Sequence, residues 1–497
     1  MGVLEIIKSQ SLTYEQKVNL LAQAAENTVQ VLNVPERTRQ YFAQKVIDDL
    51  GEGAAPYRPR YILPDYKRFL ENGSEFLQLN PPQDLDEALN ALLILYRHVP
   101  SITTFPVYLG SLDELIEPYT EGVSDEELKK KLRLFLTYID RTITDSFCHA
   151  NLGPRETRTG RIILELEREL QHAVPNLTLI YDPEVTSDDF LQEALYTSLF
   201  CANPAICNHV VNRGTYSVGY GVASCYNVLP LGGGGFTLSR VILARAARLA
   251  TSIDDFFERV LPDVLTAMAE YMNERIRFIV EESGFFASSF LVNEGLIHSD
   301  RFVGMFGFVG LAEATNILLE GTGKRYGHDP EADDLAERIM MALDEFVDKF
   351  PALYSPLTGG RFMLHAQVGL SDDVGITPGV RIPVGEEPEN LADQLRHAAR
   401  FQRLITTGCS DIYPMETTAR NNPQAMVDIV KGAVDLGVRY LAFYEENSDL
   451  VRITGYLVKR SEMEKYRNEQ AVLQNTTRFG VDAFAVNKGA ERKVRGV

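Results

Sequence analysis

The strongest constraint on the fold of this chain is the alternation of short β-like segments with long helical ones. Apolar, β-branched and aromatic runs predict strands over 102–109, 177–181, 206–211, 221–228, 362–368, 379–384 and 440–443. Helical spacing of apolar residues predicts helices over 84–96, 159–172, 237–250, 253–282, 310–319, 332–350, 391–404 and 423–436. Strands that alternate with helices indicate an α/β fold, although periodicity does not separate an open sheet from a barrel.

The same patterns divide the chain into regions. Residues 1–100 are mostly helical in pattern, residues 101–440 carry the alternation of strands and helices, and residues 441–497 form a C-terminal region. We find no low-complexity linker and no internal repeat between them.

Composition narrows the partners. The 497 residues include 49 Lys and Arg against 69 Asp and Glu, a formal charge of −20 that argues against nucleic acid as a main partner.

We expect no signal peptide and no membrane-spanning segment, because no apolar run is long enough. None of the five cysteines forms a C-x-x-C pair, so we expect no metal site and free thiols in a reducing cytoplasm. They are Cys148, Cys201, Cys207, Cys225 and Cys409.

Two segments are unusual. Gly455 interrupts an apolar, β-rich run over 449–458, where a glycine most often marks a bulge or a close backbone contact. Cys225 follows an apolar run at 221–224 and precedes Pro230 and the glycines of 232–235. Core packing is the ordinary interpretation of such a cysteine. The glycine run lacks the spacing of a phosphate-binding loop, so we expect tight packing there, with a phosphate at a helix beginning near Thr237 as the alternative.

The sequence Arg-Ile-Thr-Gly-Tyr-Leu at 452–457 resembles the C-terminal radical loop of glycyl radical enzymes, and 221–235 resembles their cysteine loop. The resemblance implies a ten-stranded barrel, built of two five-stranded halves and surrounded by helices. It implies a glycyl radical on Gly455, installed by a separate radical S-adenosylmethionine activase with an iron–sulfur cluster. Cys225 would then form a thiyl radical that takes hydrogen from a small polar substrate. No cofactor bound in the chain, sensitivity to oxygen and a homodimer are also implied.

The resemblance is strongest to the YjjI-like subgroup, from about residue 100 to the end. Segments 305–314 and 402–440 also resemble anaerobic ribonucleotide reductases. Three features of better-known relatives are missing: Asn227 replaces the Glu of a Cys-x-Glu motif, Ser224 replaces a second cysteine, and 441–454 lacks zinc-binding cysteines. The reaction therefore stays open. The alternatives are a reductase-like enzyme acting on a nucleotide and a non-catalytic, radical-bearing or binding protein.

Four further polar residues are weaker candidates for contacting the substrate or transferring protons. Asn208 and His209 lie within one predicted strand and His365 within another, where a histidine is more often a satisfied core group. Glu416 lies in a polar loop with Cys409 and Asp411, where entry into a helix is as good an explanation as catalysis.

Overall fold

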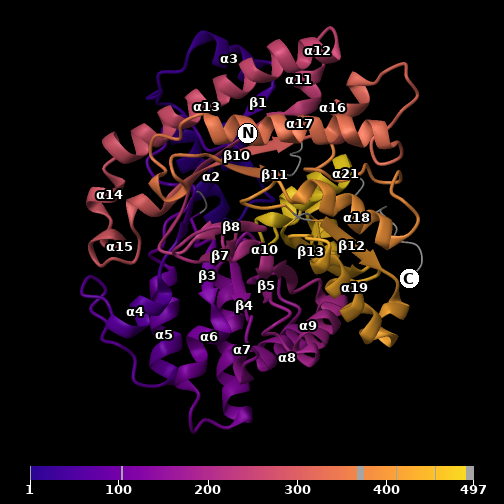
Figure 1. The fold of residues 1–497 in the computed structure, drawn as a ribbon. Coiled ribbons are helices and arrows are strands. Elements are labelled where there is room, and N and C mark those ends of the chain that lie inside the picture. The colour runs from indigo at the N-terminus through magenta and orange to yellow at the C-terminus, as the bar shows by residue number, and fades with distance from the viewer. Residues whose placement is uncertain (1, 102–103, 367–373, 410, 454, 488–497) are drawn as a thin grey trace.

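Two mixed β-sheets lie at the centre of the molecule (Figure 1). The computed structural model describes residues 2–101, 104–366, 374–409, 411–453 and 455–487. In the first sheet β9, β10 and β11 are parallel, and β1 and β2 pair antiparallel with β9. Its strands are β1 Ile47–Asp48, β2 Tyr61–Leu63, β9 Gly233–Ile242, β10 Phe302–Val309 and β11 Met363–Ala366.

The second sheet has the order β12-β13-β6-β5-β4-β3. Strands β3 to β6 are parallel, β13 runs antiparallel to β6, and β12 is parallel to β13. Its strands are β3 Tyr108–Ser111, β4 His149–Leu152, β5 Asn176–Tyr181, β6 Ala205–Asn208, β12 Asp411–Met415 and β13 Tyr440–Glu445. Nearly every residue of both sheets is buried, which is typical of strands covered on both faces.

The two sheets approach each other along both edges and enclose a hairpin. On one side β11 meets the segment before β12, where the Ala366 amide donates to the Gly408 carbonyl (3.0 Å). On the other side β2 neighbours β3. The hairpin of β7, Tyr220–Ala223, and β8, Asn227–Pro230, lies between the sheets, against β3 and β4 on one side and β9 and β10 on the other. A second hairpin, β14 Leu450–Arg452 and β15 Leu457–Lys459, follows β13.

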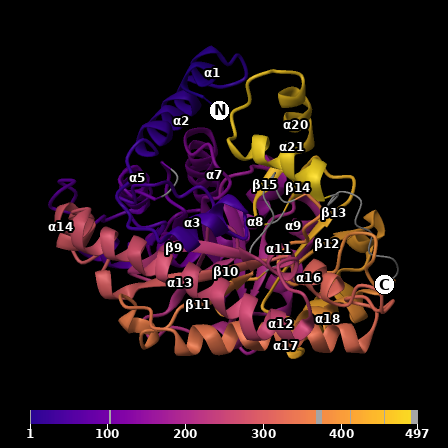
Figure 2. The same cartoon turned by 90° about the horizontal axis from the view of Figure 1, so that it is seen from above.

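Helices cover the outer faces (Figures 1 and 2). α13 packs on β9, α17 on β11 and α9 on β13. The N-terminal helices α1 and α2 lie beside the C-terminal helices α20 and α21, and the Gln16 amide donates to the Val472 carbonyl between them. Within the described ranges, no helix combines the length and the apolar character that crossing a membrane requires. The longer helices are α2 Tyr14–Glu26, α5 Leu85–Tyr96, α7 Asp125–Thr142, α8 Arg158–Leu170, α9 Asp188–Cys201, α13 Leu261–Arg277, α17 Pro330–Lys349, α18 Leu391–Gln402 and α19 Pro423–Asp435.

Further α-helices complete the fold. They are α1 Val3–Lys8, α3 Glu36–Ala43, α4 Tyr66–Asn72, α6 Leu112–Ile116, α10 His209–Asn212, α11 Leu243–Ala247, α12 Ile253–Asp255, α14 Phe285–Ser288, α15 Phe290–Asn293, α16 Leu311–Leu318, α20 Arg460–Arg467 and α21 Thr476–Asn487.

Local chemistry explains where several helices begin. The side chains of Thr13, Asp84, Ser124 and Thr157 each accept a hydrogen bond from a backbone amide in the first turn of α2, α5, α7 and α8. Such caps satisfy donors that have no partner within the helix. Helices α5, α7 and α8 also each turn an apolar, leucine-rich face inward, and burial of that face stabilises each helix against its neighbours.

The predicted helix over 237–250 is wrong: β9 extends to Ile242, and only the short α11 follows. The glycine run instead begins β9, as tight packing requires. A Cβ atom added to Gly233 would lie 2.6 Å from the Arg301 Cβ, and one added to Gly234 would lie 2.9 Å from the Tyr61 carbonyl carbon. No helix begins at Thr237, so the phosphate site proposed there has no helix N-terminus to provide it.

Several other boundaries differ from the sequence prediction. The strand expected over 102–109 begins only at Tyr108, with residues 102–103 outside the described part, and 379–384 forms turns. The run 221–228 is a hairpin, because residues 224–226 form a turn within it. The N-terminal region is helical but also supplies β1 and β2, so residues 1–100 share the first sheet with the rest of the chain.

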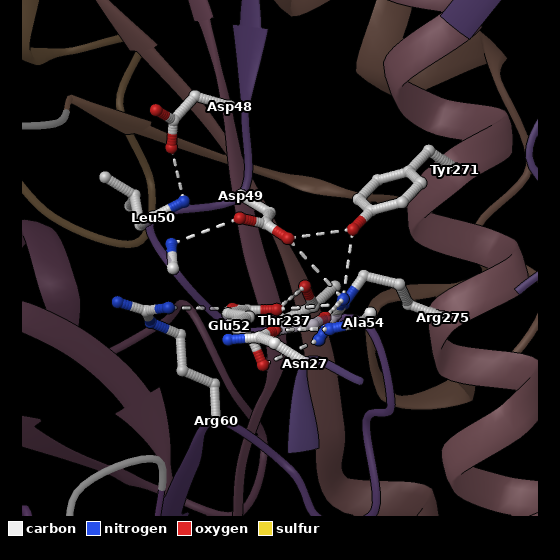
Figure 3. Close-up of polar contacts among 12 residues, drawn as sticks. Asn27, Asp48, Asp49, Leu50, Glu52, Ala54, Arg60, Thr237, Tyr271 and Arg275 are labelled. Carbon is white, nitrogen blue, oxygen red and sulfur yellow. Dashed lines mark hydrogen bonds and ion pairs between the residues drawn. The ribbon is translucent and has the colours of Figure 1, made fainter. Parts of the chain in front are cut away.

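A buried charged cluster joins this N-terminal region to the first sheet (Figure 3). Glu52 follows β1 and pairs with Arg60 (2.9 Å) and with Arg275 of α13 (3.1 Å). Its carboxylate also accepts from the Leu238 amide (2.7 Å) and the Thr237 hydroxyl of β9. One carboxylate therefore connects β9, α13 and the loop that precedes β2.

We expect Glu52→Gln to destabilise the protein by about 3–5 kcal/mol, because two buried guanidinium groups would lose their shared counter-charge. The side chains of Glu52 and Arg275 are only 3% and 2% exposed. Urea denaturation followed by circular dichroism measures the change. Glu71→Gln, which breaks the exposed pair with Lys67, is the matched control and should change stability by less than about 1 kcal/mol. Equal stabilities of the two variants would contradict the assignment.

Candidate active site

Cys225 lies in the turn of the β7–β8 hairpin, between the two sheets. Ser224 precedes it with φ of +60°, a conformation uncommon outside glycine that makes the turn tight. The hairpin is held by backbone-directed contacts. The Ser224 amide donates to the Val107 carbonyl (3.0 Å), and Asn151 of β4 forms two hydrogen bonds with the backbone of Val222 (2.8 and 3.0 Å).

The Cys225 thiol is held in its neutral, protonated form. All of residues 221–230 are buried except Cys225, which keeps part of its surface accessible. Burial raises the pKa of the Cys225 thiol to about 12, while the nearby Arg452 lowers it and Asp145 raises it by smaller amounts. The thiol is therefore protonated at every pH that the protein would meet.

Gly455 lies directly against this cysteine. It occupies the turn between β14 and β15 and is buried. A Cβ atom added to Gly455 would lie 2.7 Å from the Cys225 Cα and closer still to its Cβ, and 2.9 Å from the Tyr226 ring. Real Cβ atoms do not approach other heavy atoms so closely, so only glycine fits this position without a shift of the loop. Both residues predicted as catalytic are thus brought together.

Buried polar groups hold the glycine loop. The Gly455 carbonyl accepts hydrogen bonds from the side-chain amide of Asn176 (2.5 Å) and from the Arg452 guanidinium (3.4 Å). Arg452 also donates to Asn176 Oδ1 (2.8 Å) and to the Ala202 carbonyl (3.0 Å). Two residues after the glycine, the Leu457 backbone exchanges two hydrogen bonds with the Ser146 hydroxyl (2.8 and 2.9 Å). The loop is therefore fixed on both sides of Gly455.

A buried hydrogen-bonded chain lies under the cysteine. It joins the Ser224 carbonyl to His149 Nδ1 (3.0 Å), His149 Nε2 to Thr178 (3.1 Å), and Thr178 to the Tyr440 hydroxyl (3.0 Å). Burial lowers the pKa of His149 to about 3, so the imidazole is neutral. Because a carbonyl only accepts, Nδ1 carries the proton, Nε2 accepts from Thr178, and Tyr440 donates to Thr178.

Sequence analysis did not identify Asn176, His149, Thr178 or Tyr440. They lie on fully buried strands, where polar residues carry no periodic signal. The pairing of β4 with β5 places His149 opposite Asn176, so one pair of neighbouring residues contacts both the cysteine hairpin and the glycine loop.

The weaker sequence candidates are distributed differently. The buried His365 ring stacks on Tyr226, next to Cys225, with ring centres 5.7 Å apart. His209 lies at the base of the hairpin, where Nδ1 contacts the Tyr220 hydroxyl (2.9 Å). Asn208 donates to the Val438 carbonyl (2.9 Å) and thereby connects β6 to the end of α19. Glu416 is exposed at the start of a 3-10 helix over Thr417–Asn421, which favours the helix-entry interpretation.

This arrangement can be compared with known proteins. The protein YjjI of Escherichia coli K12 is 44% identical over 494 residues, which cover 99% of this chain and 95% of that protein. Two solved structures share the fold at low identity. The anaerobic ribonucleotide reductase of Thermotoga maritima has a TM-score of 0.69 at 14% identity, covering 94% of this chain and 93% of that one. A structure described for 1,2-propanediol dehydration in Roseburia inulinivorans has a TM-score of 0.71 at 11% identity, covering 99% and 88%.

The structural matches confirm the expected α/β architecture of the glycyl radical enzyme barrels. Here the two main sheets contain five and six described strands. The family model "Glycyl radical enzyme YjjI-like" matches residues 12–495, so the similarity begins well before residue 100, where the sequence motifs placed it. With nearly the whole chain covered, this protein is an enzyme that belongs to the YjjI-like family of glycyl radical enzymes.

Proposed function

We propose that Gly455 stores an organic radical and that Cys225 converts it into a thiyl radical that attacks the substrate. The contact between Gly455 and the Cys225 backbone is the observation that carries this proposal. Direct hydrogen-atom transfer needs donor and acceptor in contact, and the heavy atoms nearest to a Cβ atom added at Gly455 belong to Cys225 and Tyr226. Membership of an enzyme family favours catalysis over the non-catalytic alternative.

The proposed reaction begins at the Gly455 α-carbon. One electron from the iron–sulfur cluster of a separate activase would cleave S-adenosylmethionine into methionine and a 5′-deoxyadenosyl radical, which would take a hydrogen atom from Gly455 and leave as 5′-deoxyadenosine. The glycyl radical then takes the hydrogen atom of the Cys225 S–H bond, which restores the C–H bond and leaves a thiyl radical. The thiyl radical takes a hydrogen atom from a C–H bond of the substrate. After the substrate radical has rearranged or fragmented, the product radical recovers that hydrogen atom from Cys225.

The surroundings of the two residues suit this chemistry. Homolytic transfer requires a protonated thiol, and burial supplies one. Burial of Gly455 also excludes water and oxygen from the proposed radical. For the same reason Gly455 would have to become exposed before an activase could reach it.

The immediate neighbours of the thiol limit the reaction. Asn227 occupies the position of the missing glutamate, and its side chain donates to the Ala223 carbonyl within the hairpin (3.0 Å). It therefore stabilises the turn and offers no carboxylate to the substrate. We infer that the substrate is small and polar, because Cys225 is only partly accessible. The reaction of this substrate needs no base at position 227. The low-identity match to a reductase concerns the fold, and the −20 charge opposes polyanionic nucleotides.

Gly455→Ala should abolish the radical. The added methyl group would collide with Cys225, so the loop must shift, and the α-carbon would lose the unsubstituted geometry that favours a planar radical. Electron paramagnetic resonance after anaerobic activation should show no doublet. Gly432→Ala in α19, where no heavy atom lies within 4 Å of the added methyl group, is the control and should give the wild-type doublet. A backbone radical of wild-type intensity in Gly455→Ala would refute the assignment.

Cys225→Ser should keep the glycyl radical but block its exchange with solvent. In D₂O the thiol becomes S–D, so reversible transfer in the wild-type protein should replace the glycine α-hydrogen and collapse the doublet to a singlet. The doublet should persist in Cys225→Ser, because the stronger O–H bond of serine does not give up its hydrogen atom to the glycyl radical. Cys409→Ser, another buried thiol, is the control and should still exchange. Exchange in Cys225→Ser would contradict the assignment and would indicate Cys409 or Cys207 as the hydrogen donor.

The same exchange should be nearly independent of pH between 6 and 10. A thiol with a pKa near 12 stays protonated throughout this range, whereas an ordinary thiol would lose most of its S–H form by pH 10. The rate of doublet collapse, measured at several pH values by rapid freezing, tests this expectation. A rate that falls tenfold or more towards pH 10 would show that the environment of Cys225 does not raise its pKa.

A further inference from the structure

The carbonyl of Gly455 receives a short hydrogen bond from a side chain that belongs to neither catalytic loop. Asn176 of β5 donates from Nδ2 to this carbonyl at 2.5 Å. The orientation of the amide is set by its other end, since Oδ1 accepts from Arg452 at 2.8 Å and an arginine only donates. The Asn176 backbone amide donates to the Cys148 carbonyl (2.9 Å), which fixes the strand beneath.

We propose that Asn176 is a positioning residue that stabilises the glycyl radical electronically, through the Gly455 carbonyl. This inference rests on the proposed function of Gly455. A radical on a glycine α-carbon is stabilised jointly by the electron-donating amide nitrogen and the electron-withdrawing carbonyl. A hydrogen bond to the carbonyl oxygen makes the carbonyl a stronger acceptor and draws spin density towards oxygen.

The surroundings strengthen this effect. Asn176 is fully buried, and the neighbouring Arg452 is 3% exposed. A hydrogen bond in such a low-dielectric site polarises its acceptor more than one in water, and no solvent is available to replace it. Arg452, which contacts both the Asn176 Oδ1 and the Gly455 carbonyl, adds its positive charge on the same side.

This hydrogen bond would affect how the radical is distributed between Gly455 and Cys225. Gly455 and Cys225 exchange one hydrogen atom, so the balance depends on the relative strengths of the glycine C–H and cysteine S–H bonds. Stabilising the glycyl side lowers the fraction of thiyl radical between turnovers and protects the stored radical. Asn176 thereby favours storage on glycine without touching the substrate.

Asn176→Asp is the critical variant, because it keeps the shape and the acceptor for Arg452 but replaces the donor that faces Gly455. The chain offers a matched control in Asn212, which is also buried, donates to the Asn208 carbonyl (2.8 Å) and accepts from Arg439 (2.8 Å). After anaerobic activation we expect Asn176→Asp to show an altered doublet splitting and about fivefold faster radical decay, the effect of losing one hydrogen bond. Asn212→Asp should match the wild-type protein.

The outcomes separate the two hypotheses. If the wild-type protein gives no glycine doublet, the proposed function fails. If the wild-type protein and both variants give the same splitting and decay, only the role of Asn176 fails. Should Asn176→Asp not fold, electron–nuclear double resonance on the wild-type radical decides. Labelling asparagine with ¹⁵N should reveal a weak coupling to Nδ2, and the absence of that coupling would overturn the inference.

Discussion

The contact between Gly455 and Cys225 constrains the rest of the structure. These residues lie in separate hairpins, yet a single methyl group on Gly455 would not fit between them. So close an approach demands that each hairpin be fixed to the same rigid body. The second sheet provides it: β4 contributes His149 and Asn151 to the cysteine hairpin, and β5 contributes Asn176 to the glycine loop. Because His149 and Asn176 are paired across β4 and β5, a slip of one residue in that register would displace both contacts at once.

Burial serves two purposes in this arrangement. It raises the pKa of Cys225 and lowers that of His149, so both groups are neutral where charge would hinder homolytic chemistry. Two buried charged groups have close polar partners. Arg452 is surrounded by carbonyl and amide oxygens, and Glu52 lies between Arg60 and Arg275. Charge in the interior therefore connects segments, whereas the Cys225 thiol and the His149 imidazole are both neutral.

The α/β class and the long amphipathic helices could be predicted from sequence. The family resemblance singled out Gly455 and Cys225, which lie in contact in the structure. The helical path over 253–282 follows its apolar spacing, and β5 occupies 176–181 almost as expected. The wrong helix over 237–250 has a clear cause: every residue of β9 is buried, including Thr237, Ser239 and Arg240, so its polar residues do not mark a solvent-facing side as they would in a half-buried strand. Asn176 and His149 escaped notice because long-range pairing, which local patterns do not record, decides what a buried polar residue contacts. The division at residues 100 and 440 stays a prediction.

The packing of Gly455 against Cys225 has a consequence for how such enzymes diversify. The glycine occupies one side of the cysteine, so a substrate can reach the sulfur only from another direction. On the mechanism proposed above, storage of the radical and recognition of the substrate fall on different faces of one side chain. Mutations that reshape the substrate face would then leave the glycine face untouched, so a new substrate could be accommodated without changes to the residues that hold the radical.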